Sequence, residues 1–354
     1  MIMIPCSKAR VHTRNSQEAC ADQTIFIEQE NTHWQEALSN SISTPQELLS
    51  LLELEPTLLP ETIKADKQFA LKVPRPFASR MEKGNPEDPL LLQVLPLGKE
   101  LSKTKGYSLD PLAENKQIPR NGVIHKYYGR LLLITSGICA INCRFCFRRH
   151  FPYGKNQLVG ENWNNALSYI ASDNTIKEVI LSGGDPLAAS DKRLGKLVSD
   201  LSEISHVKTL RIHTRLPIVI PQRITREMLQ WLTGSRLKPV VVIHCNHINE
   251  IDLSVEAALS KLQQAGVILL NQTVLLKGIN DSSEALIALN QKLFHSSVLP
   301  YYLHLLDPVQ GAAHFDVNDT IAKRLIKTIM AKSPGYLVPR LVREIAGCPC
   351  KTPV

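Results

Sequence analysis

The chain has 354 residues, 44% of them hydrophobic and 21% charged, so it can bury a sizeable core and lacks the composition of long disordered stretches. Its formal net charge is +8, but the Lys and Arg residues are scattered apart from one cluster at 144–150, without interleaved aromatics, which argues against nucleic-acid binding. No stretch reaches the roughly 18 apolar residues of a membrane span and the N-terminus lacks a secretory apolar core, so we expect a cytoplasmic protein that uses clustered cysteines for metal binding or catalysis.

The first 120 residues differ in character from the rest. They are polar, with a helical pattern at 44–54 and a proline-punctuated segment at 72–76. We expect residues 1–120 to form a helical N-terminal region that packs on the main domain, residues 121–354. No motif in this region indicates a chemistry.

From about residue 125 onward, short apolar and β-branched runs alternate with amphipathic patterns. The runs predict strands at 131–135, 179–182, 207–213, 240–244, 267–276 and 299–306. The amphipathic patterns predict helices at 191–204, 226–232, 255–265, 284–294 and 321–331. This alternation is typical of βα units, so the predicted fold class is α/β, a parallel (β/α)6 partial TIM barrel.

Polar residues follow each predicted strand. The C-terminal ends of parallel strands meet at one mouth of a barrel, so we expect one site to be built there. The ordinary polarity of loops could explain polar residues at one or two strand ends, but it explains six of them poorly. Cys139 lies in the loop after the first strand, Ser182, His213 and His244 end the next three strands, and Gln272 and His304 lie on the last two.

The loop after the first strand holds Cys139, Cys143 and Cys146. Three thiolates within eight residues can bind three irons of one cubane cluster. Structural zinc is the alternative, since His150 could supply a fourth ligand. The CxxxCxxC spacing directly after the first strand resembles the radical S-adenosylmethionine superfamily. That resemblance implies a 4Fe-4S cluster whose open iron binds S-adenosyl-L-methionine and whose electron cleaves it to a 5′-deoxyadenosyl radical.

The second strand ends in Ser182, Gly183, Gly184 and Asp185. Glycines let the backbone approach a ligand closely, although a tight strand–helix turn would explain the pair equally well. One βα unit after the cysteine loop, the segment resembles the superfamily loop that holds the amino group of S-adenosylmethionine.

The C-terminal segment places Lys351 in Lys-Thr-Pro-Val after a glycine-containing turn. A lone Lys near a chain end is usually solvated, but this segment resembles the pyridoxal-phosphate lysine of the lysine 2,3-aminomutases, where the amine condenses with the cofactor aldehyde. The resemblance covers residues 120–354 and implies an isomerase that converts (S)-α-lysine to (R)-β-lysine. It further implies that pyridoxal 5′-phosphate is contacted by Tyr127 and Arg130, in a cavity lined by His244 and Gln272.

The same resemblance assigns the two ends of the substrate L-lysine. Arg148 resembles the residue that pairs with the α-carboxylate, a task that suits a guanidinium. Asp307 and Glu344 match the carboxylates that hold the ε-ammonium. In isolation, Asp307 would be a turn or helix-capping residue and Arg148 a surface ion-pair partner.

Three departures from the family pattern concern Glu344, Ser282 and the C-terminal cysteines. The family has Asp where Glu344 stands, so the lysine tail is expected to sit differently. Ser282 replaces a zinc-binding cysteine, and Cys348 with Cys350 makes too few ligands, so we predict no structural zinc. The short architecture resembles a bacterial subgroup that makes β-lysine for elongation factor P, which implies a functional link to that factor and its lysine ligase.

Other functions remain open from the sequence. Within the family, the substrate could be free lysine for a β-lysine pool, or glutamate, which two acidic side chains disfavour. A radical methyltransferase or maturase would leave Lys351 unexplained. A non-enzymatic iron–sulfur sensor or nucleic-acid-binding protein fits neither the scattered charge nor the Gly-Gly-Asp loop. We also expect a reductant such as flavodoxin or ferredoxin, no membrane partner and a homo-oligomer as one possible state.

Overall fold

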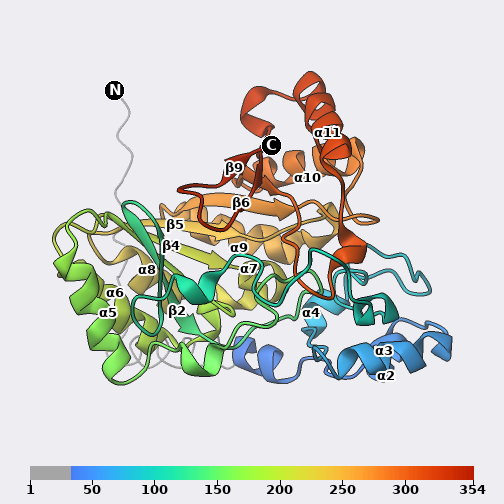
Figure 1. The fold of residues 1–354 in the computed structure, drawn as a ribbon, viewed down its shortest axis with the longest axis horizontal. Helices are drawn as coiled ribbons and strands as arrows, with labels where there is room; N and C mark the ends of the chain where they lie inside the picture. Colours follow the sequence, from blue (N-terminus) through green and yellow to red (C-terminus); the bar gives the residue numbers. More distant parts are fainter. Residues whose placement is uncertain (1–32) are drawn as a thin grey trace, which may run out of the picture.

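Nine strands form a single sheet in the order in which they occur along the described chain, residues 33–354 of a computed structural model (Figure 1). Strands β2 (Arg130–Ser136) to β8 (Arg340–Arg343) pair in parallel with their neighbours. Strands β1 (Val123–Tyr127) and β9 (Thr352–Pro353) add antiparallel edges. The predicted α/β class with a parallel sheet is therefore confirmed.

Each strand from β2 to β7 is followed by a helix before the next strand begins. The strands and helices predicted after residue 125 all occur, and their ends differ from the predicted ones by at most two residues. The sequence analysis did not predict α5, β1, β8 and β9. The units are α5 (Glu161–Ser172), β3 (Glu178–Gly183), α6 (Asp191–Ser202), β4 (Thr209–Thr214), α8 (Arg226–Thr233), β5 (Lys238–Ile243), α9 (Leu253–Gln264), β6 (Ile268–Val274), α10 (Ser283–His295), β7 (Leu299–His304) and α11 (Asp319–Lys332).

Local sequence explains where the helices begin. The side chains of Thr225, Asp252, Ser282 and Asn318 each accept a hydrogen bond from a backbone N–H in the first turn of α8, α9, α10 and α11, respectively. Such N-caps satisfy donors that have no partner within the helix. Ser282 therefore has a structural role in this chain as the cap of α10.

The described part of the N-terminal region begins with helical residues 33–39. Helices α2 (Pro45–Leu51), α3 (Leu59–Asp66) and α4 (Arg75–Ala78) follow, below the sheet in Figure 1. From α4 to β1 the chain is proline-rich and carries turns and short 3₁₀ segments. Phe77 and Trp34 belong to the same buried apolar cluster as strand residues of the sheet. The boundary at residue 120 stays a prediction, but the region packs into the core beneath the sheet.

No helix in residues 33–354 is long and apolar enough to cross a bilayer. In Figure 1, helices α5 and α6 lie at one end of the sheet and α10 and α11 at the other. The edge formed by the strands' C-terminal ends positions the candidate site.

Candidate active site

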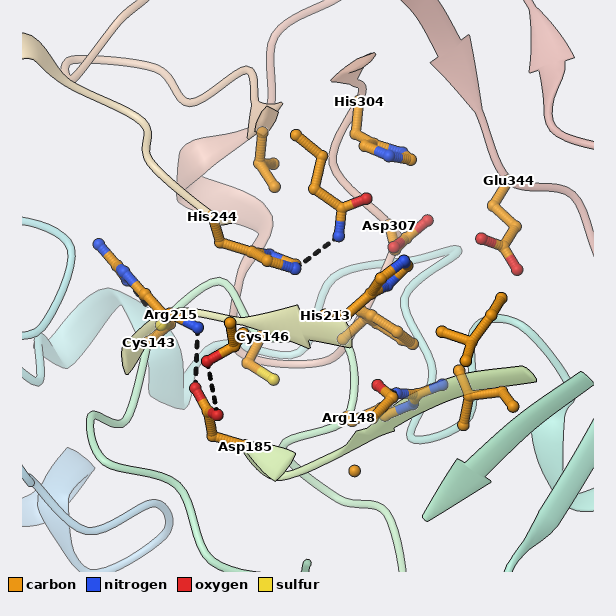
Figure 2. Close-up of a pocket in the computed structure, with 18 of the residues that line it drawn as sticks. Cys143, Cys146, Arg148, Asp185, His213, Arg215, His244, His304, Asp307 and Glu344 are labelled. Atoms are coloured by element: carbon orange, nitrogen blue, oxygen red, sulfur yellow. Dashed lines mark hydrogen bonds between the residues drawn. The ribbon is translucent and has the colours of Figure 1, made fainter. Parts of the chain in front are cut away.

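A cavity of about 580 Å³ opens where the strands end, a volume typical of a small-molecule site. Figure 2 shows side chains from several strand ends turned toward it. All residues that the sequence analysis assigned to the site line this one cavity: Tyr127, Arg130, Cys139, Cys143, Cys146, Arg148, Ser182, Gly183, Gly184, Asp185, His244, Gln272, Asp307, Glu344 and Lys351.

The three cysteines lie in the loop between β2 and α5. Burial, with the neighbouring thiols, raises the pKa of Cys139, and raises that of Cys146 to about 11. Three convergent thiols in apolar surroundings suit a positively charged group that stabilises their thiolates. No group of three or more His, Cys, Asp and Glu in the described chain is close enough to hold a single metal ion. Cubane ligands bind separate irons and stand further apart than zinc ligands, so the set fits a cluster better than zinc.

The N-terminal region holds this loop in place. The backbone N–H of Asn142 donates to the carbonyl of Lys72 at 3.0 Å, and that of Arg144 to the carbonyl of Gln93 at 2.9 Å. The fully buried Arg144 guanidinium binds both oxygens of Glu100 at 2.8 and 2.6 Å. The region in which no functional motif was found therefore anchors the cysteines.

The glycine pair after β3 packs against backbone. A Cβ on Gly183, whose φ is +126°, would lie 2.3 Å from the carbonyl oxygen of Ser136, and one on Gly184 would lie 2.6 Å from that of Ile138. The N–H groups of Gly184 and Asp185 donate to these two carbonyls, both at 2.8 Å. The glycines are thus required because the backbone at the start of the cysteine loop approaches them closely. The sequence analysis had explained the glycine pair by close approach of a ligand or by a tight turn.

The Asp185 carboxylate is buried and joins two strand ends. It accepts from Thr214 Oγ1 at 2.7 Å and from the N–H of Arg215 at 2.8 Å, and further from the N–H groups of Leu187 and Leu216. Burial, partly offset by these hydrogen bonds, raises its pKa to about 6. Its side chain is therefore occupied in fixing the loop.

A chain of alternating charges crosses the cavity. Arg148 donates from Nε and Nη2 to both oxygens of Glu114 at 2.6 and 2.8 Å, and from Nη1 to Ser182 Oγ at 3.0 Å. Lys126 bridges Glu114 and Glu344, 2.9 Å from each. Lys351 Nζ completes the chain at 2.8 Å from Glu344.

The two carboxylates predicted to hold an ammonium differ sharply. Although burial opposes it, the ammonium groups of Lys351 and Lys126 hold the pKa of Glu344 below its ordinary value. Burial, together with the Glu344 charge, raises the pKa of Asp307 to about 7. Among the described residues, the Asp307 carboxylate has no hydrogen-bond or ion-pair partner. Figure 2 shows Asp307 and Glu344 facing the same space.

A hairpin places Lys351 in the cavity. Strand β9 pairs with β8, with Thr352 opposite Arg343, so Lys351 returns beside Glu344. Its Nζ lies 5.6 Å from the centre of the Tyr302 ring.

Burial, with the charge of the nearby Glu344 carboxylate, raises the Tyr127 pKa. The Arg130 guanidinium lies 4.8 Å from the centre of the Tyr127 ring. Aromatic rings and cations therefore line the same cavity as the lysine amine.

The cavity histidines are neutral. Burial lowers the pKa of His244 to about 3 and those of His213 and His304 well below the ordinary value. The Nε2 atoms of His244 and Gln272 lie 2.5 Å apart, so the amide donates to the imidazole.

Three buried nitrogen atoms along one face of β4 and its end have no partner in the described chain: Arg211 Nε, His213 Nε2 and Arg215 Nε. All three residues line the cavity. Buried donors without partners are rare and typically mark a place where a bound group is missing. This face therefore has capacity for a polar ligand.

Sequence reasoning missed Glu114 and Lys126. Glu114 lies in the region assigned no chemistry, and neither residue belongs to a motif. Arg215 was likewise assigned no role. No local signal identifies such residues, because their partners are distant along the chain.

Comparison with known proteins agrees with this geometry. A model described as a 4Fe-4S single cluster domain matches residues 129–218, which include the cysteine loop and the Gly-Gly-Asp loop. Among solved structures, native anSMEcpe with bound AdoMet and Kp18Cys peptide aligns over 57% of this chain and 58% of its own, with a TM-score of 0.43 and 11% identity, a likeness too distant to inform the site.

Characterised relatives match along nearly the whole chain. The L-lysine 2,3-aminomutase of Haemophilus influenzae is 50% identical over 323 residues, 91% of this chain and 96% of its own length. That of Escherichia coli is 49% identical over 91% of this chain and 94% of its own, and that of Clostridium subterminale is 34% identical over 91% and 77%. The chain belongs to the L-lysine 2,3-aminomutase family and is an isomerase.

Proposed function

We propose that this enzyme converts (S)-α-lysine to (R)-β-lysine with a radical derived from S-adenosylmethionine and with pyridoxal phosphate, and that the product serves the modification of elongation factor P. The family's cofactors are a 4Fe-4S cluster, S-adenosylmethionine and pyridoxal phosphate. The observation that carries the proposal is that one cavity brings together three thiols, a lysine amine and anchors for both ends of an amino acid.

We assign the cluster to Cys139, Cys143 and Cys146. A cluster held there would supply, together with S-adenosylmethionine, the radical chemistry that the proposed reaction requires. The chain's own contribution is to hold the three sulfurs on one rigid loop, which Glu100 and the backbone of the N-terminal region fix. Gly183 and Gly184 allow the next loop to pack directly on it.

We assign pyridoxal phosphate to Lys351. When bound, it supplies a π-system that carries the amino group between C2 and C3. The flanking Tyr302 ring and the cations Arg130 and Arg211, which also line the cavity, suit an aromatic phosphate ester. The unpartnered donors of Arg211 and His213 are consistent with this fit.

We propose that Arg148 and Asp307 fix the two ends of lysine. Glu114 binds the Nε and Nη2 edge of Arg148, which leaves N–H groups of the outer edge for the substrate α-carboxylate. Asp307 has no partner in the described chain and can accept the ε-ammonium. Both contacts hold C3 at a defined place, which is positioning catalysis.

We propose for Glu344 a role that differs from the predicted one. It already binds two resident ammonium groups, those of Lys126 and Lys351. Glu344 would thus hold the Lys351 amine as an ammonium whenever that amine is not joined to the cofactor. We therefore propose that Asp307 is the main anchor of the substrate ε-ammonium and that Glu344 is the anchor of Lys351.

The finer architecture and partners are also proposals. A sheet whose strand ends from β2 to β8 all reach one cavity is consistent with a partial (β/α)6 barrel. The link to elongation factor P rests on the resemblance to the short bacterial subgroup and is consistent with matches over nearly the full length of the relatives. An external reductant such as flavodoxin or ferredoxin, and a homo-oligomeric state, remain expectations.

The test is direct turnover. Anaerobically reconstituted protein, with dithionite, S-adenosylmethionine and pyridoxal phosphate, is given L-lysine, and the products are separated on a chiral column. We expect (R)-β-lysine from the wild type and none from Lys351→Ala. Release of 5′-deoxyadenosine without β-lysine would overturn the mutase assignment. Transfer of the product to elongation factor P by its lysine ligase tests the biological role, and a free β-lysine pool without transfer would contradict it.

A further inference from the structure

A buried guanidinium lies directly against one of the three cysteines. Arg215, immediately after β4, donates from Nη1 to Cys143 Sγ at 2.7 Å. Its side chain is 7% exposed. The contact joins the end of one strand to a loop that begins two strands away, so it depends on the tertiary fold.

The guanidinium is fixed on several sides. Its Nη2 donates to Gln93 Oε1 at 2.6 Å and to Glu250 Oε2 at 2.9 Å. Its central carbon lies 5.3 Å from the centre of the Phe77 ring and 5.8 Å from that of Phe145. Held by two acceptors and two aromatic faces, Arg215 cannot turn its charge away from the sulfur.

The carboxylate that holds Arg215 is itself fixed. Glu250 is fully buried, and its other oxygen accepts from the N–H groups of Asn246 at 2.8 Å and His247 at 3.0 Å and from Gln93 Nε2 at 3.1 Å. Both oxygens of Glu250 are therefore hydrogen-bonded, which holds the carboxylate in place. Arg215 and Glu250 therefore form a buried dipole whose positive end touches Cys143 and whose negative end points away from it.

We infer that Arg215 is a positioning residue that raises the reduction potential of the cluster by its N–H···S hydrogen bond and its charge. The inference rests on the proposed assignment of the cluster to Cys139, Cys143 and Cys146. Reduction adds an electron to a cluster that thiolates already make negative, so a cation beside a ligand sulfur stabilises the reduced form. Arg215 thus makes the electron transfer that starts the reaction more favourable.

The two halves of the ion pair must act in opposite directions. Arg215→Gln removes the cation and leaves the Glu250 charge, so the potential falls. Glu250→Gln removes the negative end and leaves the Arg215 charge, so the potential rises. A merely structural role of the pair predicts a loss of cluster or a shift of the same sign in both variants.

The experiment is a redox titration of anaerobically reconstituted holoenzyme without S-adenosylmethionine, followed by electron paramagnetic resonance, with iron and sulfide measured for each variant. We expect Arg215→Gln to lower the midpoint potential of the cluster by ~59 mV or more, which is a tenfold change in the one-electron reduction equilibrium. We expect Glu250→Gln to raise the midpoint potential. An unchanged or raised potential in Arg215→Gln, at full cluster content, overturns the inference.

Arg223→Gln is the matched control. Arg223 is also buried, pairs with Asp191 at 2.7 Å and lies over the Trp34 ring, but it makes no contact with the cysteine loop among the described residues. We expect no shift in potential. If Arg215→Gln does not fold, an unchanged or lowered potential in Glu250→Gln overturns the inference. Cys143→Ala tests the underlying assignment separately, because a cluster retained at full iron content in that variant would refute the proposed site itself.

Discussion

The ionisation of Asp307 should control how tightly the enzyme holds the substrate side chain. Burial, with the nearby Glu344 carboxylate, raises the Asp307 pKa to about 7. Only the ionised form can pair with the ε-ammonium, so affinity should fall as the pH drops below 7. The cations beside Glu344 hold its pKa low, so it stays ionised in this range and contributes no slope.

The magnitude follows from a charge-assisted hydrogen bond at a buried site. Such a contact is worth about 1.5–3 kcal/mol, roughly 10- to 150-fold in affinity. By linkage, the bound ammonium lowers the Asp307 pKa by about 1–2 units. The loss should therefore approach tenfold per pH unit from about pH 7 down to about pH 5–6 and then level off.

The assay compares L-lysine with L-norleucine, which lacks the ε-ammonium. Both bind through the same α-amino group and carboxylate, so the ratio of their dissociation constants cancels the titration of those groups. It also cancels that of Asp185, whose pKa is raised to about 6 by burial. Binding is followed by the cofactor absorbance between pH 5 and 8.5. Asp307→Asn should reduce the preference for lysine by the same 10- to 150-fold at pH 8 and remove its pH dependence. A flat ratio in the wild type would refute the reasoning.

Two further variants test the geometry of the site. Gly183→Ala should destabilise the protein by about 1–3 kcal/mol and weaken binding of S-adenosylmethionine, measured by urea unfolding and calorimetry, because its Cβ would meet the Ser136 carbonyl at 2.3 Å. Gly266→Ala is the control, because Gly266 also has a positive φ, +81°, but has open space where a Cβ would lie. An equal loss of unfolding free energy in Gly266→Ala would show that backbone strain alone explains the effect at Gly183. Glu344→Gln should cost about 3–5 kcal/mol, because it leaves the largely buried Lys351 ammonium without a carboxylate and Lys126 with Glu114 alone. Glu53→Gln, which breaks an exposed pair with Lys83, should change the free energy of unfolding little. Equal losses of unfolding free energy in Glu344→Gln and Glu53→Gln would contradict the idea that burial makes the Glu344 ion pairs important.

The sequence predicted the sheet, and the residues at the C-terminal ends of its strands, for one physical reason. In a parallel sheet, each strand delivers its last residues to the same edge, so chemistry-bearing types at successive strand ends indicate one site. Cys139, Gly183, His244 and Asp307 were found by this reasoning together with the family resemblance. Their positions follow from chain order and need no knowledge of side-chain packing.

The missed elements have weak local signals. Helix α5 buries only Ala166 and Ile170 along its length, so its apolar periodicity is faint. Strand β8 has four residues and an Arg at each end. Both are determined by the sheet and helices that they contact, so the tertiary context decides them.

The interpretation of the glycine pair shows a different limit. The sequence indicated that backbone approaches closely at Gly183 and Gly184, which is correct. The sequence could not identify which group approaches, because a ligand and the Ser136 carbonyl would both exclude a Cβ atom at this position. Contacts between the N-terminal region and the cysteine loop, such as Glu100 with Arg144, were unpredictable for a related reason, since no sequence pattern relates charges 44 residues apart.

The missed residue Glu114 has the largest consequence for the mechanism. Burying several ionised groups in one cavity is costly unless each charge has partners on both sides. Glu114 and Glu344 each lie between two cations, which makes the arrangement stable in the substrate-free state. Asp307 lies near the end of this chain of charges and has no partner in the described protein. The proposed substrate, an α-amino acid with a cationic tail, would place its ammonium beside Asp307 and its carboxylate beside Arg148, so the unpaired carboxylate would gain a cation.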